Sequence, residues 1–141
     1  MSDCLICGLI AGELERSVPY EDEETIVFVD LNPVVRGHMF VVPRRHAPQL
    51  ADLETNEASA MMRTARRAAA ALRASELRCD AVNLFLADGE AAGQEVFHAH
   101  LHVIPRYDGD GFGLRFPPDY GQKPRAELDE VRDLVREAWP A

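Results

Sequence analysis

Three histidines alternate with apolar residues toward the C-terminal end of the chain, in the order His98-Ala99-His100-Leu101-His102. Successive side chains of a β-strand point to opposite faces, so all three imidazoles are expected on one face, with neighbours about 6.5–7 Å apart. Imidazole can act as nucleophile, base or acid near neutral pH because its unperturbed pKa is about 6.5. The spacing therefore predicts a reactive face whose intervening apolar side chains belong to a core.

Alternating histidines also occur outside reactive sites. A strand histidine is often purely structural, several histidines can bind a metal ion, and engineered tags also repeat histidine. A tag would be terminal and would lack apolar residues in the gaps, whereas Val103 and Ile104 continue the pattern here. Three of the five histidines fall within five positions, which favours a functional cluster.

The composition is typical of a soluble globular domain, and the sequence pattern makes the cytoplasm its expected location. The chain has 141 residues, of which 47% are hydrophobic and 28% charged, as expected for one domain with its own core. No apolar stretch reaches about 18 residues and no secretory signal is visible, so neither a membrane span nor export is expected. The formal net charge of −9 argues against nucleic acid as the main partner, but not against a small phosphate-bearing ligand.

Hydrophobic periodicity predicts an α+β fold. Strands are expected at 25–30, 38–42, 81–86 and 96–104, and helices at 4–14, 55–77 and 125–139, with a Gly- and Pro-rich loop at 109–121. Pro43 and Pro105 are expected to end the strands that precede them. The edge of so small a sheet needs cover, and self-association is one way to supply it.

The N-terminus carries a candidate metal or redox motif, because Cys4 and Cys7 form a Cys-x-x-Cys pair. We interpret the third cysteine, Cys79, as structural. A thioredoxin-like redox pair follows a strand, for which there is no room here. A tetrahedral zinc site needs four nitrogen or sulfur ligands, so histidines would have to complete it. Spacing alone does not choose among the candidates, which are His38, His46, His98, His100 and His102.

The segment 93–104 resembles the signature of the histidine triad (HIT) superfamily, His-x-His-x-His followed by apolar positions. The segment 30–46 is similar to that family's first strand pair and its Pro-x-x-x-Gly-His turn, and the segment 4–13 resembles the opening of zinc-containing bacterial members. The resemblance implies one HIT domain over 1–141, with a core at 4–105 and a variable loop and helix at 106–141. It also implies an antiparallel meander with one long helix, assembled as a homodimer that binds a purine nucleotide or dinucleotide.

The same resemblance implies catalytic roles. His100 would attack the α-phosphorus of a nucleoside phosphoramidate or dinucleoside polyphosphate and form a nucleotidyl-histidine intermediate. His102 would donate to a phosphate oxygen or to the leaving group. Gln94 would contact the bridging oxygen and later the attacking water, and His38 would support the cluster from the neighbouring strand.

Substrate and metal ligands also follow from the resemblance. Asp30 would accept hydrogen bonds from the ribose hydroxyls, while Leu31 and Ile6 would line the base. A structural zinc ion, with no organic cofactor, would be held by Cys4, Cys7, His46 and His98.

Two departures from the family pattern keep a second hypothesis open. Ala87 stands where many bacterial members carry Asn, and Glu95 stands where phosphoramidate-cleaving members often place a hydroxyl. Both changes affect the expected environment of the leaving group. The alternative is therefore a nucleotide-binding sensor or partner protein with little catalysis, and a small zinc-stabilised redox module is the third possibility.

Overall fold

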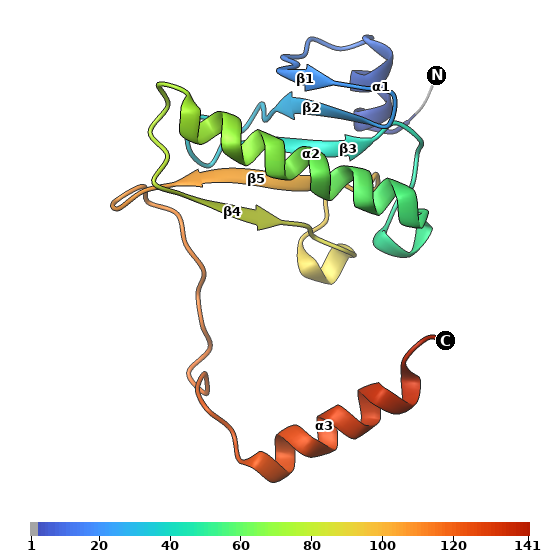
Figure 1. The fold of residues 1–141 in the computed structure, drawn as a ribbon, viewed down its shortest axis with the longest axis vertical. Helices are drawn as coiled ribbons and strands as arrows, with labels where there is room; N and C mark the ends of the chain where they lie inside the picture. The colour runs from blue at the N-terminus through green and yellow to red at the C-terminus, as the bar shows by residue number, and fades with distance from the viewer. Residues whose placement is uncertain (1–2) are drawn as a thin grey trace.

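The computed structural model describes residues 3–141 and confirms the expected α+β fold, an antiparallel sheet flanked by helices (Figure 1). The strands are β1 (Tyr20–Glu21), β2 (Thr25–Val29), β3 (Met39–Pro43), β4 (Ala81–Phe85) and β5 (Leu101–Arg106). The helices are α1 (Leu5–Ala11), α2 (Thr55–Ala74) and α3 (Arg125–Ala138), with single 3₁₀ turns at Leu50–Asp52 and Glu90–Ala92. No helix within 3–141 is long and apolar enough to cross a membrane.

The sheet is a simple meander only over its first three strands. The spatial order is β1-β2-β3-β5-β4, with every neighbouring pair antiparallel. Helix α2 carries the chain across one face of the sheet to β4 at the far edge, and β5 then returns between β4 and β3 (Figure 1). This crossover places the histidine-bearing strand inside the sheet, beside β3.

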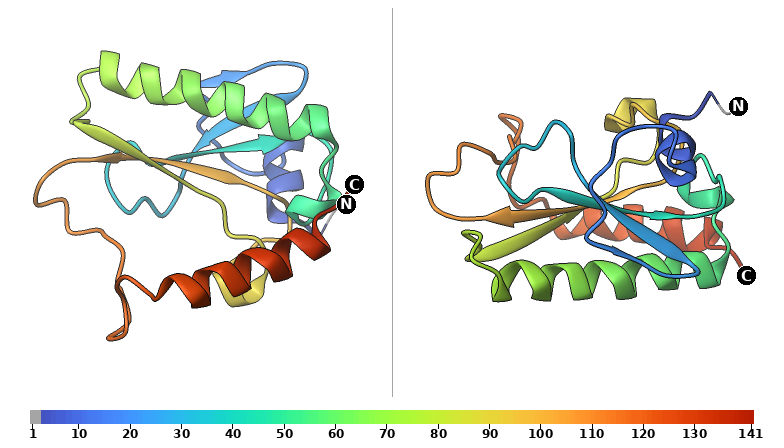
Figure 2. Two further views of the ribbon diagram at one scale, coloured as in Figure 1. Left: turned by 60° about the horizontal axis from the view of Figure 1, so that its bottom comes forward. Right: turned by 90° about the horizontal axis from the view of Figure 1, so that it is seen from above.

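The sheet separates two apolar clusters. On one face, Val41 and Val103 pack with Met61 and Leu72 of α2. On the other face, Ile6 of α1 packs with a second cluster, Ile26, Phe28, Phe40 and Val42. The right-hand view of Figure 2 shows α1 and α2 on opposite sides of the sheet. Alternation along β5 therefore turns Val103 toward α2 and His102 toward the face that carries α1.

The histidine strand begins later than expected. β5 starts at Leu101, so His98 and His100 precede it and only His102 lies on it. β3 ends at Pro43, which has no N–H to continue the ladder, and Ala99 instead donates its N–H to the carbonyl of Ala47, 2.7 Å away. The three imidazoles are therefore not one regular row, and this difference separates their environments.

The second proline does not end its strand. β5 continues through Pro105 to Arg106, in contrast to the sequence-based expectation. Proline is tolerated there because β3 pairs with β5 only over Leu101–Val103, so this end of β5 borders β4 alone.

Helix α3 stands apart from the sheet in Figure 1, and none of its residues is buried. Its apolar side chains are exposed, with Leu134 at 61% and the following Trp139 at 73% of their full exposure. An amphipathic helix is usually stabilised by burying its apolar face. Within the described chain, this face has no such cover.

Candidate active site and adjoining metal centre

The backbone fixes the tautomer of His100. Its Nδ1 lies 2.8 Å from the carbonyl oxygen of His98. A carbonyl can only accept, so Nδ1 carries the proton and the lone pair resides on Nε2. The His100 ring packs edge-on against Phe40 and His102 and is only partly buried. This is the form of imidazole that a nucleophile requires.

A hydrogen-bond chain fixes the tautomer of His102 in the opposite sense. The N–H of Val34 donates to His38 Nδ1 over 3.1 Å, so His38 carries its proton on Nε2. His38 Nε2 lies 2.8 Å from His102 Nδ1 and donates to it. His102 therefore carries its own proton on Nε2, where it can donate a hydrogen bond to a ligand. The neighbouring His100 offers a lone pair on its Nε2 instead.

The turn before β3 places His38 in this hydrogen-bond chain. Gly37 has φ +101, and a Cβ at this position would lie 3.2 Å from side-chain carbons of Leu77 and Pro105. Only glycine combines that left-handed backbone with so close an approach. The Gly-His pair singled out in the sequence is thus required by the packing of the turn.

Burial favours the neutral forms of His38 and His102. Burial lowers the pKa of His38, and the Asp30 carboxylate opposes this change only in part. Burial, with additional repulsion from His100 and His38, lowers the pKa of His102 to about 4. The hydrogen-bond chain above needs neutral rings, so the electrostatics and the geometry agree.

Protonation of His102 is expected to destabilise the fold in acid. Between pH 4 and 6.5 the folded state binds fewer protons at this ring than the unfolded state, so stability is complete above about pH 6.5 and falls toward pH 4. Between pH 7 and 5, the free energy of unfolding should fall by about 2 kcal/mol more for the wild type than for His102→Gln. Urea titrations of both proteins at both pH values measure this difference, and parallel losses would contradict it.

Asp30 lies at the edge of the same cluster. Its Oδ2 is 3.4 Å from His38 Nε2 and 3.9 Å from His102 Nδ1, while its Oδ1 accepts the N–H of Asn32. These three side chains are close enough to hold a metal ion. However, His38 Nε2 carries the proton that joins it to His102, so a metal would have to displace that proton. The arrangement fits a hydrogen-bond network better than a metal site.

Gln94 is built into the turn before the histidines. Its Oε1 accepts the N–H of Gly89 at 2.8 Å, and its Nε2 donates to the carbonyls of Pro48 and Val96. The side chain is buried and both amide hydrogens are used within the protein. Its contact with a bridging oxygen stays a prediction. In this structure, Gln94 positions the turn.

The predicted base-contacting residues differ sharply in exposure. Leu31 is 91% exposed beside Asp30, whereas Ile6 is 2% exposed within the cluster beneath α1. Leu31 is therefore exposed enough to contact a ligand, whereas Ile6 of α1 packs against the sheet. Of the two departures from the family pattern, Ala87 is buried and Glu95 is exposed.

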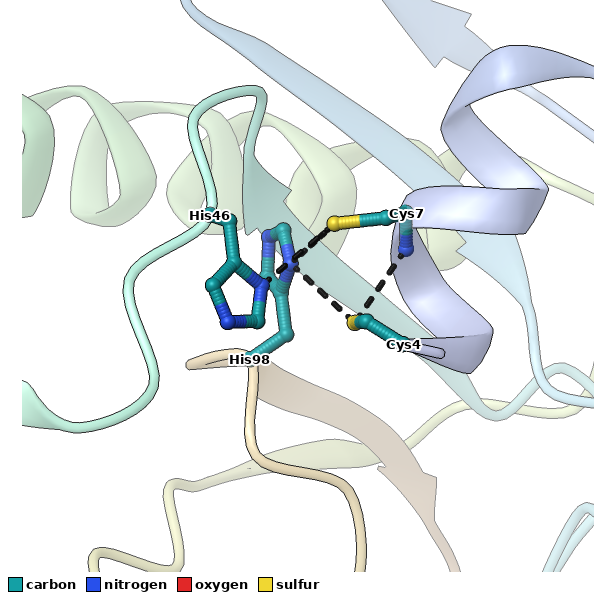
Figure 3. Close-up of side chains that lie close together, drawn as sticks. All are labelled: Cys4, Cys7, His46 and His98. Carbon is teal, nitrogen blue, oxygen red and sulfur yellow. Dashed lines mark hydrogen bonds between the residues drawn. The ribbon is translucent and has the colours of Figure 1, made fainter. Parts of the chain in front are cut away.

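The four predicted metal ligands come together at the start of α1 (Figure 3). His98 Nδ1 lies 3.5 Å from Cys7 Sγ and 3.7 Å from Cys4 Sγ, and His46 Nδ1 lies 3.4 Å from Cys7 Sγ. In a tetrahedral zinc site, sulfur and nitrogen ligands are about 3.5 Å apart, given the usual bond lengths. These distances fit zinc.

The completely buried His98 has the tautomer that a metal ligand needs. Its Nε2 lies 2.9 Å from the carbonyl oxygen of Pro43 and donates to it, which leaves the Nδ1 lone pair directed at the two sulfurs. A metal-binding histidine typically donates its second ring N–H in this way. Burial lowers the pKa of His98, which keeps the ring neutral and able to coordinate.

Sequence patterns did not identify the groups that set these tautomers. The N–H of Val34 and the carbonyls of Pro43 and His98 belong to the backbone, so residue type gives no signal for them. Phe40 could have been found, because strand alternation places it on the histidine face, where it pairs with His102.

Fold and site together define a class of small α+β proteins in which a cluster of imidazoles lies beside a Cys₂His₂ group. The model of the HIT domain matches residues 11–109 of this chain. A HIT-like protein of Methanocaldococcus jannaschii is 37% identical over 133 residues, which cover 94% of this chain and 98% of that protein. The chain therefore belongs to the HIT family.

Other relatives extend the comparison. The adenylylsulfatase HINT3 of Arabidopsis thaliana is 34% identical over 109 residues, covering 77% of this chain and 55% of that protein. A HIT family protein of Bacillus anthracis has a TM-score of 0.89 at 32% identity, with 99% of each chain covered. A zinc-bound histidine triad family protein of Mycobacterium smegmatis has a TM-score of 0.76 at 35% identity, covering 96% of this chain and 97% of that one.

Proposed function

We propose that this protein is a nucleotide hydrolase or transferase that cleaves at the α-phosphorus of nucleoside phosphoramidates or dinucleoside polyphosphates through a nucleotidyl intermediate on His100. The observation that carries the proposal is the hydrogen bond from His100 Nδ1 to the carbonyl of His98, which leaves the Nε2 lone pair available. The adenylylsulfatase activity in the name of HINT3 is consistent with this class of reaction.

The first step forms a bond from His100 Nε2 to phosphorus and breaks the bond to the leaving group, which departs with the bonding electrons and takes a proton from solvent. His102 Nε2–H donates to a phosphate oxygen, where negative charge accumulates in the transition state. Because burial keeps His102 neutral, this donor is present without a competing proton on Nδ1. His38 positions His102 and does not touch the phosphate.

The second step breaks the bond between phosphorus and His100. Water, or another acceptor, attacks the phosphorus and the electron pair returns to Nε2. The hydrogen bond to the His98 carbonyl prevents the ring from rotating between the two steps. The same tautomer therefore serves as nucleophile first and as leaving group second.

The Cys₂His₂ group is proposed to hold zinc. When bound, zinc cross-links the N-terminus to the segment before β5 and supplies no open coordination position for catalysis. His98 belongs both to this group and, through its carbonyl, to the active site. The zinc-bound relative supports the assignment.

Replacement of Asp30 should weaken ribose recognition. The partly exposed carboxylate can accept hydrogen bonds from vicinal hydroxyls, and each such bond to a charged group contributes about 1.5–3 kcal/mol. Asp30→Asn should therefore weaken binding of a ribonucleotide about 10-fold or more and leave binding of its 2′,3′-dideoxy analogue nearly unchanged. Calorimetric titration with both ligands measures this, with Asp80→Asn, an exposed position, as the control. Equal losses for both ligands would contradict the role.

A nucleotide-binding sensor is the second candidate, favoured by Ala87 and Glu95, the two departures from the family pattern that are expected near the leaving group. A panel of adenosine phosphoramidate, diadenosine polyphosphates and adenylyl sulfate separates the two candidates. Release of AMP at a rate that depends on His100 supports the enzyme. Tight binding of the panel without product supports the sensor and rejects the enzyme.

We also propose a homodimer, because a second copy of the chain could bury the exposed apolar side chains of the edge strand β4 and of α3. Leu84 and Phe85 on the edge strand β4 are 43% and 46% exposed. The wild type should sediment at twice the chain mass of 15.7 kDa, and Leu84→Lys should shift it toward the monomer. A wild type that sediments as a monomer at micromolar concentration would contradict this proposal.

A further inference from the structure

The two cysteines of the metal centre are accessible from outside. Cys4 and Cys7 are both only partly buried, and His46 is exposed. An open groove of about 550 Å³ reaches the centre, lined by Asp3, Cys4, Leu5, His46, Glu95, Val96 and Phe97. A small oxidant can therefore approach Cys4 through this groove without unfolding of the domain, and Cys7 is partly exposed nearby.

The geometry of the pair suits a disulfide. Cys4 immediately precedes α1 and Cys7 is its third residue, with the Cys7 N–H donating to Cys4 Sγ over 3.3 Å. Residues three apart on a helix have Cα atoms about 5 Å apart, within the range that a disulfide spans. Because that N–H points at Cys4 Sγ, it also stabilises negative charge on this sulfur.

We propose that Cys4 and Cys7 form a reversible oxidation site, at which a peroxide converts the metal-binding thiolates into a disulfide and releases the metal. One thiolate attacks the peroxide oxygen and becomes a sulfenic acid, with hydroxide as the leaving group. The second thiolate then attacks that sulfur and displaces a second hydroxide. Two thiolates and one hydrogen peroxide, with two protons from solvent, give one disulfide and two waters. This inference rests on the proposed zinc centre and on the proposed role of His100.

Oxidation of Cys4 and Cys7 would affect the proposed nucleophile His100 through His98. Three interactions of His98 link the two sites: Nδ1 faces the sulfurs, Nε2 donates to Pro43, and the carbonyl accepts from His100 Nδ1. Loss of the metal removes the first of these and leaves a buried imidazole with an unsatisfied Nδ1. The segment that holds His100 in its reactive tautomer is then less constrained, so the oxidation state of the cysteines controls the active site.

The test uses the full-length, reduced protein, in which metal content is measured first. One to a few equivalents of hydrogen peroxide are then added while a metal-sensitive dye records zinc release and peptide mass spectrometry locates oxidised cysteines. Cys79→Ser is the control, because Cys79 lies elsewhere, where its Sγ contacts the carbonyl of Ala81. Nitrogen-15 NMR of the imidazoles reports the His100 tautomer independently of turnover.

The expected result is release of about one zinc per chain, in proportion to a Cys4–Cys7 disulfide and equally in the Cys79→Ser variant. Exchange at the His100 Nδ1–H should increase on oxidation and return after treatment with dithiothreitol and zinc. Retention of zinc by the peroxide-treated protein, or oxidation of Cys79 before the pair, overturns this inference alone. A reduced protein that contains no zinc overturns both this inference and the proposed metal centre.

Discussion

Replacement of His100 by asparagine should lower turnover by about 10⁴-fold or more, because no other imidazole nearby presents a lone pair outward. His102 carries its proton on the ligand-facing Nε2, and His38 is buried and hydrogen-bonded at both nitrogens. Loss of a nucleophile commonly costs an enzyme several orders of magnitude in kcat. Steady-state assays with adenosine phosphoramidate measure the loss.

The same variant should remain folded. His100 is only partly buried, and asparagine can donate to the His98 carbonyl in its place. The melting temperature and zinc content of His100→Asn should therefore match those of the wild type. His102→Ala is the informative comparison, since it removes the Nε2–H donor, and loss of such a hydrogen-bond donor costs about 10²–10³-fold. Substantial turnover by His100→Asn would show that another group attacks the phosphorus.

Loss of zinc should produce the largest effect on stability. A ligand present at 1,000 times its Kd stabilises the folded state by about 4 kcal/mol. Removal of zinc by a chelator, or by His46→Ala, should therefore lower the melting temperature by about 15 °C. Calorimetry with metal analysis of the same samples measures both quantities.

Two ligand variants separate the metal from the packing. His46 is exposed, so His46→Ala removes a ligand and little else, whereas His98 is completely buried and also bonded to Pro43. His98→Ala should be less stable than His46→Ala by a further 1–3 kcal/mol or so, because it leaves a cavity and an unpaired carbonyl. Zinc binding at wild-type affinity by either variant would contradict the assigned ligand set.

Much of the fold was predictable because its signals are local. The apolar alternation of β2 and β3, and the helix formers between Thr55 and Ala74, give the correct elements within a few residues. Strand β1, with two residues, is too short to show an alternation of apolar residues. The position of β5 between β3 and β4 was not predictable from periodicity, because it depends on how α2 crosses the sheet.

The candidate site was predictable in its residue types but not in its tautomers. The spacing of His98, His100 and His102 predicts one shared face, and only the resemblance to the HIT family gives the three rings different roles. In the structure, β3 ends at Pro43 and its carbonyl binds His98, so this ring turns to the cysteines while His102 stays on the strand. The three rings differ because the carbonyls of Pro43 and His98 fix the first two, whereas the N–H of Val34 fixes the third through the His38 side chain. These backbone groups have no counterpart in the pattern of side chains.

The most direct test of nucleophilic attack by His100 is a search for the covalent intermediate. The protein is mixed with adenosine phosphoramidate, denatured at alkaline pH before one turnover is complete, and digested for peptide mass spectrometry. We expect an adenylyl group on His100, absent in His100→Asn and present at wild-type level in Asp80→Asn. An adenylyl group on His102 or on another residue, or AMP formed within that first turnover with no adduct on His100, would contradict this mechanism.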